Sequence, residues 1–92
     1  MIDPELVRIM DSFADEGVVP SAEAIDKALN IASASMANAQ ALLAGAYAIE
    51  ARHLSAAHTR CTRCYALEGL TRRGEAMIIW HLEDSGTERR RA

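Results

Sequence analysis

The sequence ALNIASASMANAQALLAGAYAI, residues 28–49, contains no charged side chain from end to end. Apolar residues recur through it and just before it in alternating steps of four and three, and they form one seam: Ile25, Leu29, Ala32, Met36, Ala39, Leu43 and Ala46. A second apolar line beside the seam consists of Ala28, Ile31, Leu42 and Ile49. A helix with two apolar sides is typical of the middle element of a helical bundle. We therefore predict a helix over about residues 22–52, which begins after a cap at Ser21.

The same uncharged stretch is long enough to cross a lipid bilayer, so a membrane span has to be weighed. Its polar members argue against a span: Asn30, Ser33, Ser35, Asn38 and Gln40. The N-terminal sequence MIDPELVRIMDSFADE is acidic and amphipathic, and it lacks the basic region of a signal peptide. The chain has 2 cysteines, too few for a disulfide framework. We expect a cytoplasmic protein that makes no membrane contact.

A short helix is predicted ahead of this stretch, over about residues 4–16. Asp3 supplies an N-cap acid, and Pro4 occupies the first helical position, where proline is well tolerated. Gly17 ends the helix. Four apolar residues recur between these ends at helical spacing: Leu6, Ile9, Met10 and Phe13.

A third helix must begin after a turn, although no glycine or proline marks that turn between Ala46 and Glu68. An unbroken helix there would exceed about 45 residues, which is rare in a small domain. We place the turn near residues 52–55 and the third helix over about 55–83. Residues 85–92 are polar and are predicted to form a flexible tail.

These three helices predict an all-α fold, in which a short N-terminal helix packs on a long antiparallel helical hairpin within one domain, residues 1–84. Only 4% of the residues are aromatic and about a fifth are alanine, which favours helices but buries little surface. A chain of 92 residues with this composition makes a weak core by itself. We therefore expect a homodimer, in which a second copy completes a helical bundle.

The motif HTRCTRC, residues 58–64, brings three potential metal ligands into one stretch: His58, Cys61 and Cys64. In the predicted third helix both thiols face the apolar side, where free cysteines are commonly buried. Positions 58 and 64 lie about 9 Å apart along a helix axis, so a single zinc ion could hardly bind all three ligands. A complete site would need ligands from elsewhere, such as His53, His81 or a second chain. We expect a packed core here and no cofactor.

No motif for catalysis is found in the sequence. It contains neither a glycine-rich phosphate loop nor a nucleophile elbow. Redox chemistry by Cys61 and Cys64 would need a helix N-terminus after a strand, whereas the predicted helix places the pair in its interior. The acid pairs Asp15-Glu16 and Glu83-Asp84 are adjacent and therefore diverge on a helix. We expect that the protein is not an enzyme.

Arginines and apolar side chains of the predicted third helix are the candidates for binding a partner. On the predicted third helix the arginines lie opposite the apolar side, and the helix becomes apolar on a second face near its end. We predict a partner-binding surface of apolar anchors with a basic rim: Arg60, Arg63, Arg72, Arg73, Met77, Ile79 and Trp80. The expected function is that of a small regulator or inhibitor that binds another protein. The size and alanine content resemble those of small bacterial regulators and phage-encoded inhibitors, as an analogy of type.

Two other functions stay open as alternatives. Arg60, Arg63, Arg72 and Arg73 could contact DNA phosphates, but the formal net charge of −3 disfavours nucleic acid. The sequence that follows these arginines, EAMIIWHL, is also too apolar to lie in a DNA groove. The second alternative is zinc binding by Cys61 and Cys64 across a dimer.

Overall fold

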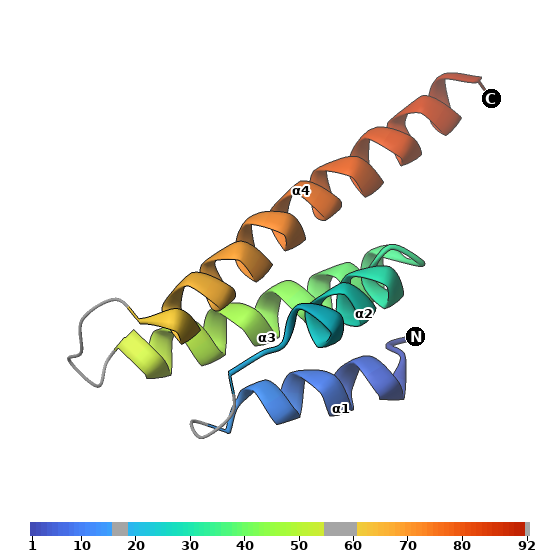
Figure 1. The fold of residues 1–92 in the computed structure, drawn as a ribbon. Helices are drawn as coiled ribbons and strands as arrows, with labels where there is room; N and C mark the ends of the chain where they lie inside the picture. Colours follow the sequence, from blue (N-terminus) through green and yellow to red (C-terminus); the bar gives the residue numbers. More distant parts are fainter. Residues whose placement is uncertain (16–18, 55–60, 92) are drawn as a thin grey trace.

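The computed structural model describes residues 1–15, 19–54 and 61–91, with Leu54 and residues 85–91 described as backbone only. The regular secondary structure of these residues is entirely α-helical. The helices are α1 (Pro4–Phe13), α2 (Ala22–Ala32), α3 (Met36–Leu54) and α4 (Thr62–Arg91), and no strand occurs among these residues (Figure 1). The predicted all-α class is confirmed.

Both predicted helix starts are found where the capping residues placed them. Asp3 is the N-cap of α1, and its carboxylate accepts a hydrogen bond of 2.8 Å from the backbone N–H of Glu5. Ser21 is the N-cap of α2, and its hydroxyl accepts the backbone N–H of Ala24 at 3.1 Å. These bonds satisfy amide groups that a helix leaves without an internal partner. The helix expected over 4–16 is shorter, because α1 ends at Phe13.

The single helix predicted over 22–52 is two helices in the structure, because the chain turns between Ala32 and Met36. The hydroxyl of Ser33 donates to the carbonyl of Asn30 at 2.6 Å, and the hydroxyl of Ser35 accepts the backbone N–H of Asn38 at 3.2 Å. Serine side chains that bond nearby backbone groups in this way compete with the helical hydrogen-bond pattern. The heptad seam indicated the apolar faces correctly but gave no sign of this break.

Asn38 holds the turn between α2 and α3 against the start of the chain. Its side-chain oxygen accepts the backbone N–H of Asp3 at 2.8 Å, and its amide nitrogen lies 3.5 Å from the carbonyl of Ile31. The residue is only 6% exposed. A buried amide that is bonded on both sides fixes the geometry of the turn, since an unpaired group there would be costly.

α3 is the central helix, and it packs against each of the other three. Figure 1 shows α1 and α2 beside α3, and α4 running back along it and then beyond it. The core between them contains five large, fully buried side chains, namely Leu6, Phe13, Leu42, Leu67 and Leu70, together with several alanines. The prediction that residues of the uncharged stretch occupy the middle of the bundle therefore holds for α3 alone.

Two glycines allow close approach between helices in this core. A Cβ atom built on Gly45 would lie 3.2 Å from the Cε atom of Met10 in α1. One built on Gly74 would lie 3.0 Å from Cδ2 of Leu42 and 3.2 Å from Cδ1 of Leu43, so α4 approaches α3 closely there. Small residues at these positions let the helices pack without displacing buried side chains.

α4 begins later and ends later than predicted. Its first residue is Thr62 rather than about residue 55, and its backbone stays helical to Arg91. The residues expected to form a flexible tail, 85–92, are therefore part of this helix up to Arg91. Glutamate and arginine, which follow Gly86 in the sequence, are good helix formers. None of the helices, as far as the structure describes them, has the length and apolarity needed to span a bilayer.

Candidate functional site

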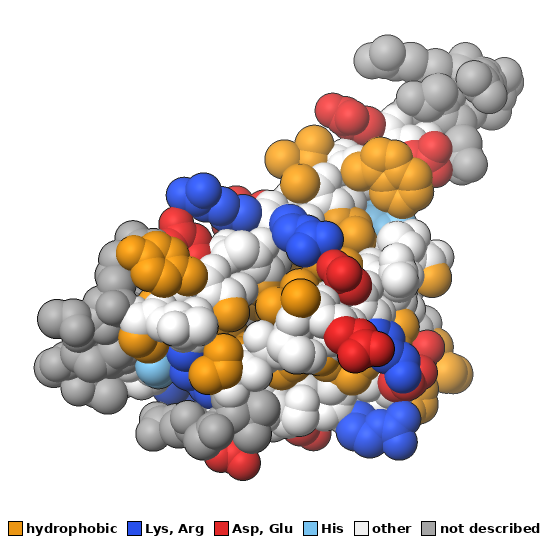
Figure 2. Space-filling view, in the orientation of Figure 1, with side chains coloured by type: hydrophobic (Ala, Val, Ile, Leu, Met, Phe, Trp, Pro, Cys, Tyr) orange, Lys and Arg blue, Asp and Glu red, His pale blue; other side chains and the backbone are white. Residues whose placement is uncertain are grey.

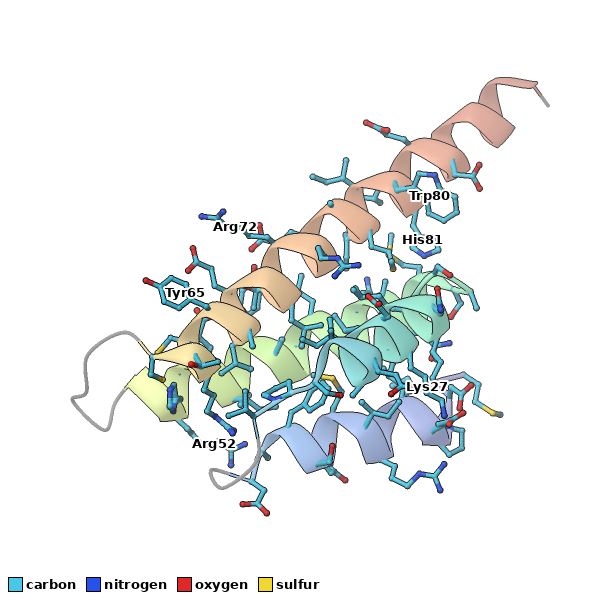
Figure 3. The ribbon with its side chains drawn as sticks, viewed as in Figure 1. Lys27, Arg52, Tyr65, Arg72, Trp80 and His81 are labelled. Atoms are coloured by element: carbon cyan, nitrogen blue, oxygen red, sulfur yellow. The ribbon has the colours of Figure 1, made fainter. Side chains whose placement is uncertain are left out.

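Two of the three predicted apolar anchors, Ile79 and Trp80, are exposed on α4 where this helix passes the end of α2. Ile79 is 55% exposed, Trp80 53% and Leu82 59%. Figure 2 shows large apolar side chains on this projecting end, and Figure 3 places Trp80 there above the end of α2. We call Ile79, Trp80 and Leu82 the Trp80 surface. Met77, the third predicted anchor, is only partly exposed and packs against the core.

His81 marks the place where α4 leaves the body of the protein. Its Nε2 atom lies 3.2 Å from the carbonyl oxygen of Ala32, at the last residue of α2. The Trp80 ring stands edge-on to the His81 ring, with 4.8 Å between ring centroids and 63° between planes. Residues 82–84 are exposed. From Leu82 to Arg91 the helix continues for about another 14 Å at 1.5 Å per residue.

An open groove between α2 and α4 continues the Trp80 surface toward the core. Its volume is about 410 Å³, and it is lined by Leu29, Ser33, Arg73, Ala76, Met77 and Trp80. Four of these side chains are apolar, and Arg73 stands at the edge, where its guanidinium lies 3.4 Å from Asp26. The groove and the Trp80 surface together have the composition that protein interfaces favour, with apolar and aromatic side chains beside an arginine.

The four predicted arginines do not form one surface. Arg63 is only 5% exposed, and its guanidinium donates hydrogen bonds to the carbonyl oxygens of Phe13, the last residue of α1, and of Asp15, at 2.8 Å for Asp15. The prediction that Arg63 faces solvent is wrong, because it assumed a helix that begins at residue 55, whereas Arg63 lies in the first turn of α4. Its positive charge complements the carbonyl groups at the end of α1.

Two of the remaining predicted arginines are exposed and form surface ion pairs, and the third is not among the residues that the structure describes. Arg72 is exposed and pairs with Glu68 at 2.8 Å, one turn earlier on α4. Arg73 pairs with Asp26 of α2 at 3.4 Å. Arg60 is outside the residues that the structure describes. A continuous basic face suited to DNA phosphates is therefore not assembled from the described arginines.

A second site lies at the other end of α4, where two thiols meet an imidazole. Nε2 of His53 lies 3.3 Å from Sγ of Cys61, and Sγ of Cys61 lies 3.6 Å from Sγ of Cys64. All three ligand atoms lie within 4.8 Å of one another. We call these residues the His53 cluster. The predicted ligand His58 lies outside the described residues, whereas His53, which the sequence suggested only as an additional ligand, is in contact with Cys61.

Cys61 precedes the first residue of α4, so the Cys-x-x-Cys pair stands at a helix N-terminus and not in a helix interior as predicted. The backbone N–H of Cys64 is the main cause that lowers the pKa of the Cys61 thiol, and the Cys64 side chain, the backbone N–H of Arg63 and its charge act in the same direction. Burial of the thiol opposes them. Hydrogen bonds to sulfur favour the thiolate, which is the form that binds metals.

Comparison of the chain with known protein families, with curated proteins and with solved structures finds no match.

Proposed function

We propose that the protein is a small interaction module that binds another protein chain through the Trp80 surface. The observation that carries the proposal is the exposure of Ile79, Trp80 and Leu82, each more than half exposed, on a helix end that α2 and α3 do not cover. Large apolar side chains exposed around one helix end are costly to leave in water, and a partner that covers them gains free energy. In this proposal the protein regulates or inhibits its partner by binding alone.

Self-association is the form of binding that the composition supports. The largest fully buried side chains are one phenylalanine and four leucines, which is a small core for four helices. Two copies that pack the projecting ends of their α4 helices together would cover both Trp80 surfaces and enlarge the apolar core. The homodimer, the antiparallel hairpin and the bundle expected from the sequence are part of this proposal.

The test compares exposed aromatic residues on the same helix. Trp80→Ala removes the centre of the proposed surface, whereas Tyr65→Ala removes an aromatic side chain that is 61% exposed, about 22 Å away along α4. Light scattering over a range of concentrations, together with affinity capture from the native host, measures binding to a second copy and to other proteins. We expect Trp80→Ala to weaken the association by about 30-fold or more, as loss of an interface tryptophan commonly does, and Tyr65→Ala to leave it unchanged.

Ile79→Ser serves as a second variant that keeps the tryptophan as a probe. The chain has a single tryptophan, so its fluorescence reports on Trp80 alone. Association through the proposed surface shifts the emission of Trp80 to shorter wavelength as the concentration rises, and Ile79→Ser reduces that shift. A protein that stays monomeric, retains no partner and shows the same emission at all concentrations would contradict the proposal.

A further inference from the structure

We propose that His53, Cys61 and Cys64 form a binding site for a zinc ion, or for another divalent ion of the same borderline-soft class, at the junction of α3 and α4. Thiolate and imidazole are the ligands that zinc prefers in proteins, and two cysteines with one histidine also occur at zinc sites that keep an open position. Sulfur ligands select against magnesium and calcium, which bind oxygen. The site needs no ligand from a second chain, in contrast to the zinc alternative suggested by the sequence.

The distances between the ligand atoms are close to the edges of a tetrahedral zinc site. Zinc bonds of about 2.3 Å to sulfur and about 2.0–2.1 Å to nitrogen give tetrahedral edges of about 3.8 Å between two sulfurs and about 3.6 Å between sulfur and nitrogen. The corresponding distances here are 3.6 Å between the two Sγ atoms and 3.3 Å between Nε2 of His53 and Sγ of Cys61. The third edge is no longer than 4.8 Å. Small changes of side-chain torsion therefore suffice to bind the ion.

The backbone places the three ligands on helix ends. His53 lies in the last turn of α3, Cys61 immediately before α4 and Cys64 in the first turn of α4. Two of the ligands thus come from the N-terminal end of α4, three residues apart, and the third comes from the helix on which α4 packs. Ligands on packed helices are held more accurately than ligands on loops, which favours binding without a large rearrangement.

The burial of the cluster also suits a bound ion. Cys64 is 7% exposed, whereas His53 and Cys61 are partly exposed, so the site is enclosed on one side and open to solvent on the other. The described residues supply three ligands, and in the proposed site a water molecule from the open side is the fourth. Binding replaces thiol protons with the ion and therefore releases protons.

Cobalt(II) is the probe for the test, because it occupies zinc sites and absorbs visible light. We expect reduced, metal-free protein to bind one cobalt ion per chain, with thiolate-to-cobalt charge-transfer bands and the intense ligand-field bands of tetrahedral coordination, and zinc to displace it. Cys61→Ser and Cys64→Ser should abolish the charge-transfer bands or reduce them strongly. His53→Ala should weaken binding by more than the about 10- to 100-fold that removal of an outer-shell partner costs.

His81→Ala is the matched control, because His81 on α4, like His53 on α3, lies beside a helix end, but it is bonded to the carbonyl of Ala32. It should leave metal binding unchanged. The competing interpretation is a set of hydrogen bonds in a packed core, which predicts only weak octahedral cobalt spectra in the reduced protein. Such spectra, or equal losses in His81→Ala and His53→Ala, would overturn the proposal.

A measurement on the unchanged protein keeps the test independent of how the variants fold. Bound zinc should slow alkylation of both cysteines by at least about 10-fold, because the metal-bound thiolate is a poorer nucleophile than a free one. It should also raise the melting temperature, since the ion binds the folded state. Alkylation rates and melting temperatures that are the same with zinc and with a chelator would contradict the site. The site lies about 28 Å along α4 from Trp80, so its failure leaves the proposed function untouched.

Discussion

Arg63 is the residue that connects the start of α4 to the end of α1. It lies in the first turn of α4, and its guanidinium donates to two carbonyl groups at the end of α1, with the Phe13 carbonyl 50 residues earlier in the chain. Burial of a charged guanidinium is costly unless it is hydrogen-bonded, so the bonds from its two terminal nitrogens to these carbonyl groups hold α1 against α4. This role is structural and excludes Arg63 from any surface that binds a partner.

Replacement of Arg63 tests this role at the scale of one residue. Arg63→Met keeps most of the aliphatic volume but removes the hydrogen bonds to Phe13 and Asp15, and we expect it to lower the free energy of unfolding by about 2–3 kcal/mol. Arg72→Ala is the control, because it breaks only an exposed ion pair with Glu68 and should cost less than about 0.5 kcal/mol. Urea unfolding followed by circular dichroism measures both. Similar losses in the two variants would show that Arg63 does not anchor α1.

At the scale of the element, the turn between α2 and α3 depends on Ser35. Its hydroxyl accepts the backbone N–H of Asn38, as an N-cap does. Ser35→Ala should therefore lower the free energy of unfolding by about 1 kcal/mol. Ser33→Ala removes only a bond to the Asn30 carbonyl on an exposed residue, and it should change stability by less than about 0.5 kcal/mol. Thermal unfolding distinguishes the two, and a larger loss in Ser33→Ala would contradict the assignment of the cap.

α4 contains two glycines whose substitution should have opposite effects. A Cβ atom at Gly69 meets nothing within 4 Å, so Gly69→Ala should stabilise the protein by about 0.5–1 kcal/mol through helix propensity. At Gly74 the Cβ would lie 3.0 Å from the fully buried Leu42 side chain, and the displacement it forces should outweigh the gain in propensity. Chemical unfolding of both variants tests this. Equal stabilisation would mean that α4 packs less closely on α3 than the structure shows.

The sequence predicted the start or end of a helix correctly where a residue at that position signals it locally. The starts at Asp3 and Ser21 follow from capping residues and were predicted correctly. The break near Ser33 was missed because periodicity records which faces are apolar and does not record hydroxyl groups that bond the backbone. The late start of α4 at Thr62 had no glycine or proline to indicate it.

In the candidate sites, too, features with a local sequence signal were predicted and features that depend on distant residues were not. Exposure of Ile79 and Trp80 could be inferred, because they continue an apolar pattern past the residues that face the core. The burial of Arg63 could not be inferred, since its acceptors lie 48 and 50 residues earlier and nothing in the local sequence records them. The meeting of His53 with Cys61 depends on how the chain returns between α3 and α4. A helical wheel gives side-chain directions around one helix and contains no information on how α3 and α4 are placed relative to each other.

At the scale of the whole molecule, the two ends of α4 have different roles. Its first turn contacts α1 through Arg63 and contains Cys64 of the His53 cluster, and Cys61 immediately precedes it, so that end belongs to the body of the protein. Its other end extends past α2 and presents the Trp80 surface (Figure 1). We therefore propose that one end of the helix contributes to stability and metal binding and that the other end binds a partner.

The most direct test of partner binding is site-specific photo-crosslinking in the native host. A photoreactive phenylalanine analogue replaces Trp80 in one variant and Tyr65 in the other, so the probes differ only in their position on α4. The account predicts a discrete crosslinked product with a second protein chain, a copy of this one or another protein, from position 80 and none from position 65. No product from position 80, or the same products from both positions, would contradict the claim that this surface binds a protein partner.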